Sequence, residues 1–111
     1  MGLFGSLFGG GINQGVDEAR STNGSIMLDV RSPEEYRSGH IEGAYNIPVN
    51  AIGKASSVVK DKDAPLFVYC LSGSRSAMAC RELERMGYSA VTNMGGINRW
   101  TGDVVRGGEP R

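Results

Sequence analysis

A cysteine ends a strongly apolar run, and this arrangement constrains the fold more than any other feature of the chain. The run "APLFVYC" ends at Cys70, and the residues after it, "LSGSRSAMACREL", pass through small polar residues and a glycine into a helical pattern. A continuous apolar run of this length suits a central strand of a parallel sheet, buried on both faces. The sequence therefore predicts a strand that ends at Cys70, a short loop and a helix.

Strand-like and helix-like segments alternate along the rest of the chain. "SIMLDV" and "SAVTN" are typical of strands, a short strand is expected in "AYNIPV", and "GIN" around Ile12 is expected to form a short first strand. "QGVDEARS", "SPEEYRSG", "NAIGKASSVVKD", "SRSAMACRELERMG" and "GGINRWTG" are expected to be helical. This alternation predicts an α/β domain with a mostly parallel sheet.

The length of 111 residues fits one domain. We expect a glycine-rich lead-in over residues 1–11, the domain over 12–107 and a tail over 108–111. The formal net charge is zero, from 12 Lys and Arg against 12 Asp and Glu. Neither nucleic acid nor an anionic membrane surface is therefore an expected partner, and no apolar run has the length of a membrane span.

The chain has two cysteines, Cys70 and Cys80, and one histidine. Two cysteines do not make a disulfide scaffold, and no CxxC or HxxH pair is present to begin a metal site. We therefore expect two free thiols, no metal or cofactor, and a reducing compartment such as the cytoplasm. Cys80 shares a helix face with Leu83, and we interpret it as a core residue.

Cys70 is the candidate reactive group. Ligands of open parallel sheets bind beyond the carboxyl ends of the strands, and a tight loop there directs successive backbone N–H groups inward. These N–H groups and the start of the next helix both favour thiolate over thiol, and Arg75 is a candidate fixed positive charge for an anionic substrate or intermediate. We expect the sulfur at the mouth of a compact ring of amide hydrogens, open to solvent and ionised near neutral pH. The alternative is inert packing, which is common for free cysteines.

Four motifs together resemble the single-domain rhodanese family. They are D-V-R-x-x-x-E-Y and G-H-I-x-G-A-x-N-I-P within residues 28–48, and C-x-x-G-x-R-S and G-G-x-x-x-W within residues 68–100. The resemblance covers about residues 12–107. It implies a three-layer α/β/α fold with a central parallel sheet of five strands.

The resemblance also implies sulfur transfer through a cysteine persulfide. Cys70 would be the nucleophile, Arg75 would stabilise anionic sulfur, and Asp29 and Arg31 would support the loop. The substrate-binding loop would comprise Leu71, Ser72, Gly73, Ser74, Arg75 and Ser76. The partners would be a small sulfur donor such as thiosulfate or a thiol persulfide, with a protein persulfide as an alternative, and a thiophilic acceptor. We expect a monomer or a weak dimer.

Two other functions stay open at this point. Related phosphatases and arsenate reductases share the fold but have a Cys-x5-Arg loop, whereas Cys70 and Arg75 frame Cys-x4-Arg and Ser76 follows. The shorter loop makes a tighter cup, which favours sulfur over phosphate. The second alternative is a non-catalytic sulfur-carrier or regulatory module. Leu71 and Ser72 are neutral where thiosulfate transferases often carry basic residues, so the sulfur donor is not settled by the sequence.

Overall fold

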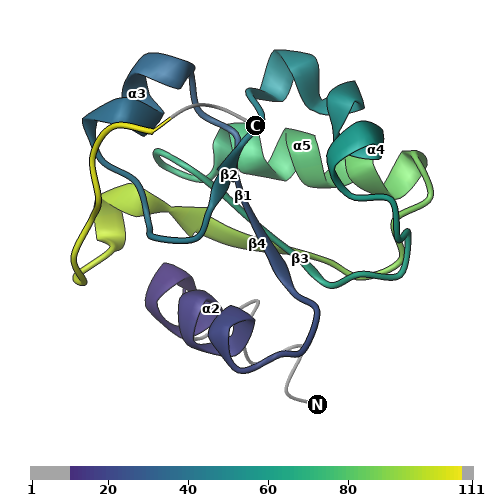
Figure 1. Ribbon diagram of the computed structural model, residues 1–111, viewed down its shortest axis with the longest axis horizontal. Coiled ribbons are helices and arrows are strands. Elements are labelled where there is room, and N and C mark those ends of the chain that lie inside the picture. Colours follow the sequence, from purple (N-terminus) through teal and green to yellow (C-terminus); the bar gives the residue numbers. More distant parts are fainter. Residues whose placement is uncertain (1–10, 109–111) are drawn as a thin grey trace.

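The computed structural model describes residues 11–108, and four parallel strands form its sheet. The strands are β1 (Ile26–Asp29), β2 (Tyr45–Asn46), β3 (Leu66–Cys70) and β4 (Val91–Gly96), in the order β2-β1-β3-β4 (Figure 1). The two strands predicted from continuous apolar runs, β1 and β3, are the two central ones. This confirms the predicted parallel α/β fold.

The expected strand around Ile12 is wrong, and the described sheet has four strands rather than five. Ile12 lies in helix α2 (Gly11–Arg20), where Ile12, Val16 and Ala19 are buried. Their spacing of four and three residues places all three on one helix face, so the helical period decides the conformation of this segment.

Helices cover both faces of the sheet (Figure 1). Helix α2 packs on one face, against Met27, Phe67 and Tyr69. The other face is covered by helix α4 (Ala55–Val58) and helix α5 (Ser74–Arg85). The β3 residues that face this second core are Leu66, Val68 and Cys70. Cys70 therefore points toward α5 because side chains alternate along a strand.

The connecting elements show where local sequence decides the structure. Helix α3 (Pro33–Ser38) begins with a capping box in which Ser32 and Glu35 satisfy each other's backbone N–H groups. The helix predicted in "NAIGKASSVVKD" is instead a 3-10 segment, η2 (Val49–Lys54), followed by α4. Ala51 has non-helical dihedral angles there, which breaks the segment. A last 3-10 turn, η3 (Ile97–Arg99), follows β4.

The predicted lead-in and tail lie outside the described residues except at their inner ends. Gly11 is the first residue of α2 rather than the last of the lead-in. Within residues 11–108, the helices are all too short or too polar to traverse a lipid bilayer.

Candidate active site

The loop between β3 and α5 holds Cys70, as the sequence predicts. We call residues 70–76 the Cys70 loop. Gly73 has φ of 111°, a left-handed conformation that favours glycine, and its N–H points back at the strand. The Gly73 N–H donates to Cys70 Sγ at 3.0 Å. The Gly73 N–H is therefore one of the inward-directed backbone donors that the sequence predicts around the sulfur.

The sulfur does not lie open at the mouth of this ring, so that expectation is wrong. Cys70 is 0% exposed, whereas Leu71 in the loop above it is 45% exposed. The reason is that Cys70 still belongs to β3, and strand alternation directs its side chain into the core beneath α5. A reagent in solution reaches the sulfur only if the residues around it move.

The surroundings of Cys70 nevertheless make its thiol more acidic than an ordinary one. Burial raises the pKa of Cys70, but hydrogen bonds from the Ser76 side chain and from the backbone N–H groups of Ser76, Gly73 and Ser72 outweigh it and lower the pKa. Such bonds stabilise the charged form of the group. This direction agrees with the predicted acidified thiol.

Ser76 is held next to the sulfur by a residue that the sequence analysis missed. Ser76 Oγ lies 3.4 Å from Cys70 Sγ and donates to Asn93 Oδ1 at 2.7 Å. Asn93 also accepts from the Gly95 N–H at 2.9 Å. A register shift between β3 and β4 at this point gives Asn93 its position. No sequence signal marks such a bulge, although the pair Gly95 and Gly96 in a strand context is a weak indication.

Arg75 is bound to a carboxylate of α3. Its two terminal nitrogens donate to Glu35 Oε1 at 2.8 Å and to Oε2 at 3.0 Å. The bond to Arg75 lowers the pKa of Glu35 to about 2, so Glu35 is ionised at neutral pH. The hydrogen bonds of Glu35 therefore join Arg75 of the loop to Ser32 at the start of α3.

Asp29 and Arg31 form a buried pair beside the loop. Arg31 Nη2 donates to Asp29 Oδ2 at 2.7 Å and to the Gly39 carbonyl at 2.7 Å. The Asn46 amide donates to the backbone carbonyls of Asp29 and Arg31. The pair therefore fixes the chain between β1 and α3, which is the geometry of structural support.

The remaining loop residues line the rim. Ser72 and Ser74 are exposed, and neither hydroxyl forms a hydrogen bond within residues 11–108. Across the same residues, no group of three His, Cys, Asp or Glu side chains could hold a metal ion.

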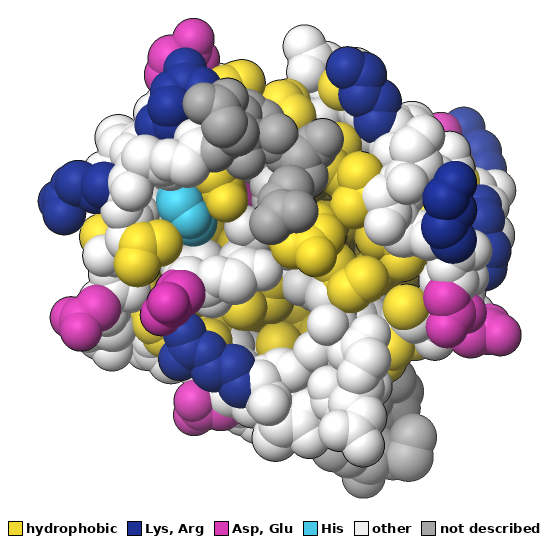
Figure 2. Space-filling view, viewed as in Figure 1, with side chains coloured by type: hydrophobic (Ala, Val, Ile, Leu, Met, Phe, Trp, Pro, Cys, Tyr) yellow, Lys and Arg dark blue, Asp and Glu magenta, His cyan; other side chains and the backbone are white. Residues whose placement is uncertain are grey.

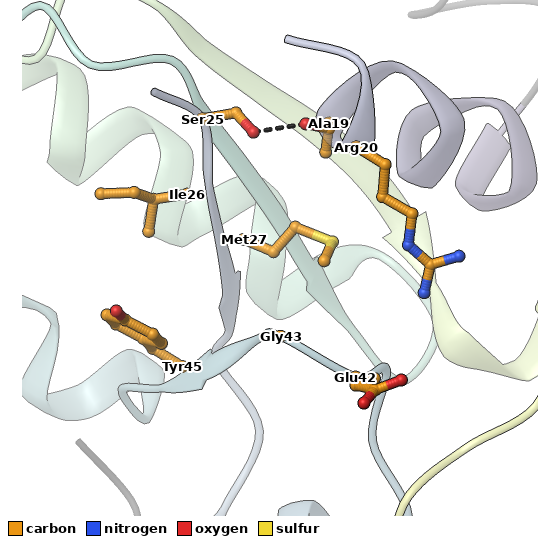
Figure 3. Close-up of a pocket in the computed structure, with 8 residues that line it drawn as sticks. All are labelled: Ala19, Arg20, Ser25, Ile26, Met27, Glu42, Gly43 and Tyr45. Carbon is orange, nitrogen blue, oxygen red and sulfur yellow. Dashed lines mark hydrogen bonds between the residues drawn. The ribbon is translucent and has the colours of Figure 1, made fainter. Parts of the chain in front are cut away.

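A separate hollow lies far from any nucleophile of the loop. It has a volume of about 270 Å³ between the end of α2, β1 and β2, with Arg20, Glu42 and Tyr45 around it (Figure 3). None of its lining residues belongs to the Cys70 loop.

In the same orientation as Figure 1, Figure 2 shows hydrophobic side chains at the centre of the visible face of the molecule and charged side chains around the rim of that face.

The comparisons with known proteins converge on one family. The model of the rhodanese-like domain matches residues 13–103. Thiosulfate sulfurtransferase PspE of Escherichia coli (strain K12) is 38% identical over 81 residues, which are 72% of this chain and 78% of that protein. YrkF of Bacillus subtilis (strain 168), named as a candidate sulfur carrier protein, is 38% identical over 80% of this chain. The match spans 46% of YrkF, so this chain covers about half of that relative.

Solved structures agree with this result. A structure described as a rhodanese with anions from E. coli superposes with a TM-score of 0.70 at 37% identity, over 75% of this chain and 99% of that one.

Proposed function

This chain belongs to the rhodanese-like domain family, and from that premise we propose that it is a sulfurtransferase that carries sulfane sulfur as a persulfide on Cys70. The observation that carries the proposal is the polar contact set of Cys70 Sγ: the Gly73 N–H donates to the sulfur at 3.0 Å, and Ser76 Oγ lies 3.4 Å from it. These groups favour the thiolate that a sulfur nucleophile requires.

The proposed reaction has two steps. The Cys70 thiolate attacks the outer sulfur of a donor such as thiosulfate, the donor S–S bond breaks, and its electron pair leaves with sulfite. The outer sulfur is now bound to Cys70 as a persulfide. A thiophilic acceptor such as cyanide then attacks the terminal sulfur of the persulfide. The S–S bond of the persulfide breaks, its electron pair returns to Cys70 Sγ, and the acceptor leaves with the sulfur atom bound to it. The cycle is ping-pong and regenerates the thiolate.

The loop residues have distinct proposed roles. The inward N–H groups of Ser72 and Gly73 stabilise negative charge on the persulfide, as an oxyanion hole does for oxygen. Arg75 contributes a cation at the start of α5, reduced by its pairing with Glu35. Asp29 and Arg31 hold the chain between β1 and α3, and Glu35 of α3 binds Arg75 of the loop.

The burial of Cys70 adds a requirement for loop opening. A sulfur that is 0% exposed cannot meet a donor until Leu71 to Ser74 move aside. The loop has three non-helical residues between β3 and α5, and such surface segments open at lower free energy than the core. We propose that the loop opens to admit the donor and closes over the persulfide.

The burial also favours one second candidate function. A closed loop that protects a persulfide and releases it only to a partner would make the chain a sulfur carrier with slow turnover. The similarity to YrkF supports this candidate. Phosphatase chemistry has no comparable support, since Cys70 and Arg75 frame the shorter Cys-x4-Arg loop.

The test is a mass measurement on the intact protein. After incubation with thiosulfate, we expect a gain of about 32 Da that is located on Cys70 and removed by cyanide. Cys80→Ser provides the matched control and should gain the same mass, whereas Cys70→Ser should gain none. A protein that turns over with cyanide is a transferase, and one that is loaded but discharges only slowly is a carrier. If no donor adds the mass, the sulfurtransferase proposal is wrong.

A further inference from the structure

We propose that Glu35 determines the specificity for the sulfur donor: by neutralising Arg75, it makes the site select an organic persulfide of low molecular weight over thiosulfate. The inference rests on the proposed function, because it concerns the first step of that reaction. Two structural features and one point of chemistry support it. The features are the absence of net charge at the Cys70 loop and the mainly apolar pocket beside Arg75, and the point of chemistry is the uncharged reacting form of the donor.

The Cys70 loop has no net charge to attract a dianion. Its only charged residue is Arg75, and both carboxylate oxygens of Glu35 bind the Arg75 guanidinium at 2.8 and 3.0 Å. The nearby pair of Asp29 and Arg31 also sums to zero. Thiosulfate carries two negative charges toward a thiolate, and the loop offers backbone N–H groups but no uncompensated side-chain cation to offset their repulsion.

An organic persulfide does not meet this barrier. Its reacting form is the uncharged R–S–S–H. The Cys70 thiolate attacks the terminal sulfur, the donor S–S bond breaks, and the inner sulfur leaves with the electron pair as R–S⁻. The products are Cys70–S–S–H and the thiolate of the donor, and the total charge of minus one is unchanged. This step needs hydrogen-bond donors but no cation.

The wall beside Arg75 suits the carbon chain of such a donor. A pocket of about 320 Å³ lies there, lined by the apolar residues Val30, Pro33, Pro48 and Val49 together with Ser32, Asn50 and Arg75. Its volume falls in the range of small-molecule sites. Because Cys70 is 0% exposed, a small thiol persulfide reaches the sulfur more readily than a cysteine carried on a folded protein.

The first experiment compares donors on the wild-type protein. The rate of the 32 Da gain at Cys70 is measured with thiosulfate, with the persulfide of 2-mercaptoethanol and with a short peptide that carries a cysteine persulfide. We expect the 2-mercaptoethanol persulfide to react about tenfold faster than thiosulfate, and faster than the peptide. A faster peptide would overturn the assignment of a small donor.

The second experiment releases Arg75 from its partner. Glu35→Gln keeps a side chain that can complete the capping box with Ser32 but removes the charge. The thiosulfate rate should rise about fivefold and become sensitive to salt, while the 2-mercaptoethanol persulfide rate stays within about twofold. Glu34→Gln is the matched control, because Glu34 is exposed in the same turn of α3, and it should change neither rate.

A third variant tests whether the effect passes through Arg75. In an Arg75→Gln background, Glu35→Gln should no longer raise the thiosulfate rate, since the charge it would release is absent. If thiosulfate is as fast as the persulfide in the wild type and Glu35→Gln changes nothing, the inference is wrong while the sulfurtransferase stands. If neither donor loads Cys70, the proposed function itself fails.

Discussion

The two cysteines lie ten residues apart and show opposite behaviour. Cys70 is completely buried, yet its pKa lies below the ordinary thiol value because hydrogen bonds from Ser76, Gly73 and Ser72 outweigh its burial. Cys80 is partly exposed on α5, yet burial and the nearby Glu84 carboxylate raise the pKa of Cys80 to about 12. The more deeply buried thiol is thus the more acidic one.

This difference teaches that exposure is a poor guide to thiol chemistry in this fold. Cys70 sits where a strand ends and a loop turns its N–H groups inward, so donors are available to a negative sulfur. The backbone N–H groups around Cys80 are consumed by the i to i−4 bonds of α5, which leaves no donor for its sulfur. The supply of hydrogen-bond donors at the end of a strand, set against the burial that raises the pKa of both thiols, separates the pKa values of Cys70 and Cys80.

The largest effect should come from replacing each sulfur in turn. Cys70→Ser should lower sulfur transfer by about a thousandfold or more, because the oxygen cannot carry the sulfane sulfur. Cys80→Ser should change the rate by no more than about twofold. Thiocyanate formation from thiosulfate and cyanide measures both, and comparable losses in the two variants would remove the distinction between the cysteines.

The next effect should come from distorting the loop without touching sulfur. A Cβ at Gly96 would overlap the Leu71 carbonyl oxygen and lie 2.6 Å from Ser72 Cα. We expect Gly96→Ala to slow loading of Cys70 by about thirtyfold and to destabilise the protein by about 2 kcal/mol. Gly53→Ala is the control, since nothing lies within 4 Å of its Cβ position. Normal loading in Gly96→Ala would show that the loop geometry is not required.

Removing one hydrogen bond to the sulfur should have an intermediate effect. Ser76→Ala should raise the pKa of Cys70 and slow loading at neutral pH by about threefold to tenfold. Ser74→Ala, at an exposed hydroxyl of the same loop, should change neither quantity. The pH dependence of the loading rate measures both, and an unshifted profile in Ser76→Ala would count against the hydrogen-bond explanation.

The smallest effect should be on stability at low pH. The pKa of Glu35 is lowered to about 2, so its pairing with Arg75 stabilises the fold above the unfolded value of about 4.3 and loses this contribution as pH falls toward 2. Since both side chains are about one-third exposed, we expect only about 1 kcal/mol. Urea unfolding between pH 5 and pH 2 should show this loss in the wild type and not in Glu35→Gln; equal slopes would contradict it.

Local pattern was sufficient for the main architecture and for the position of Cys70 between β3 and α5. The apolar runs predict β1 and β3, and the end of β3 followed by Gly73 predicts the loop, because chain direction and residue size decide both. The capping signal of Ser32, Pro33 and Glu35 likewise predicts the start of α3, which the structure confirms.

The local sequence pattern does not show which distant residues come into contact in the folded chain. The bulge that brings Asn93 to Ser76 depends on how β4 pairs with β3, and the bond between Glu35 and Arg75 joins residues 40 positions apart. The burial of Cys70 likewise depends on how α5 packs against the core face of β3. The strand expected around Ile12 fails for a simpler reason, since three residues are too few to show the helical period that Val16 and Ala19 complete.

The most direct measurement is the pH dependence of alkylation of the two cysteines by iodoacetamide, a small reagent. Peptide mass analysis locates and quantifies the modification at each cysteine. We predict that Cys70 reacts with a midpoint clearly below the ordinary thiol value of about 8.5, while Cys80 stays unmodified through that range. If Cys70 instead titrates at or above that value, or is never alkylated in the folded protein, its surroundings do not stabilise an accessible thiolate, and the account of this site is contradicted.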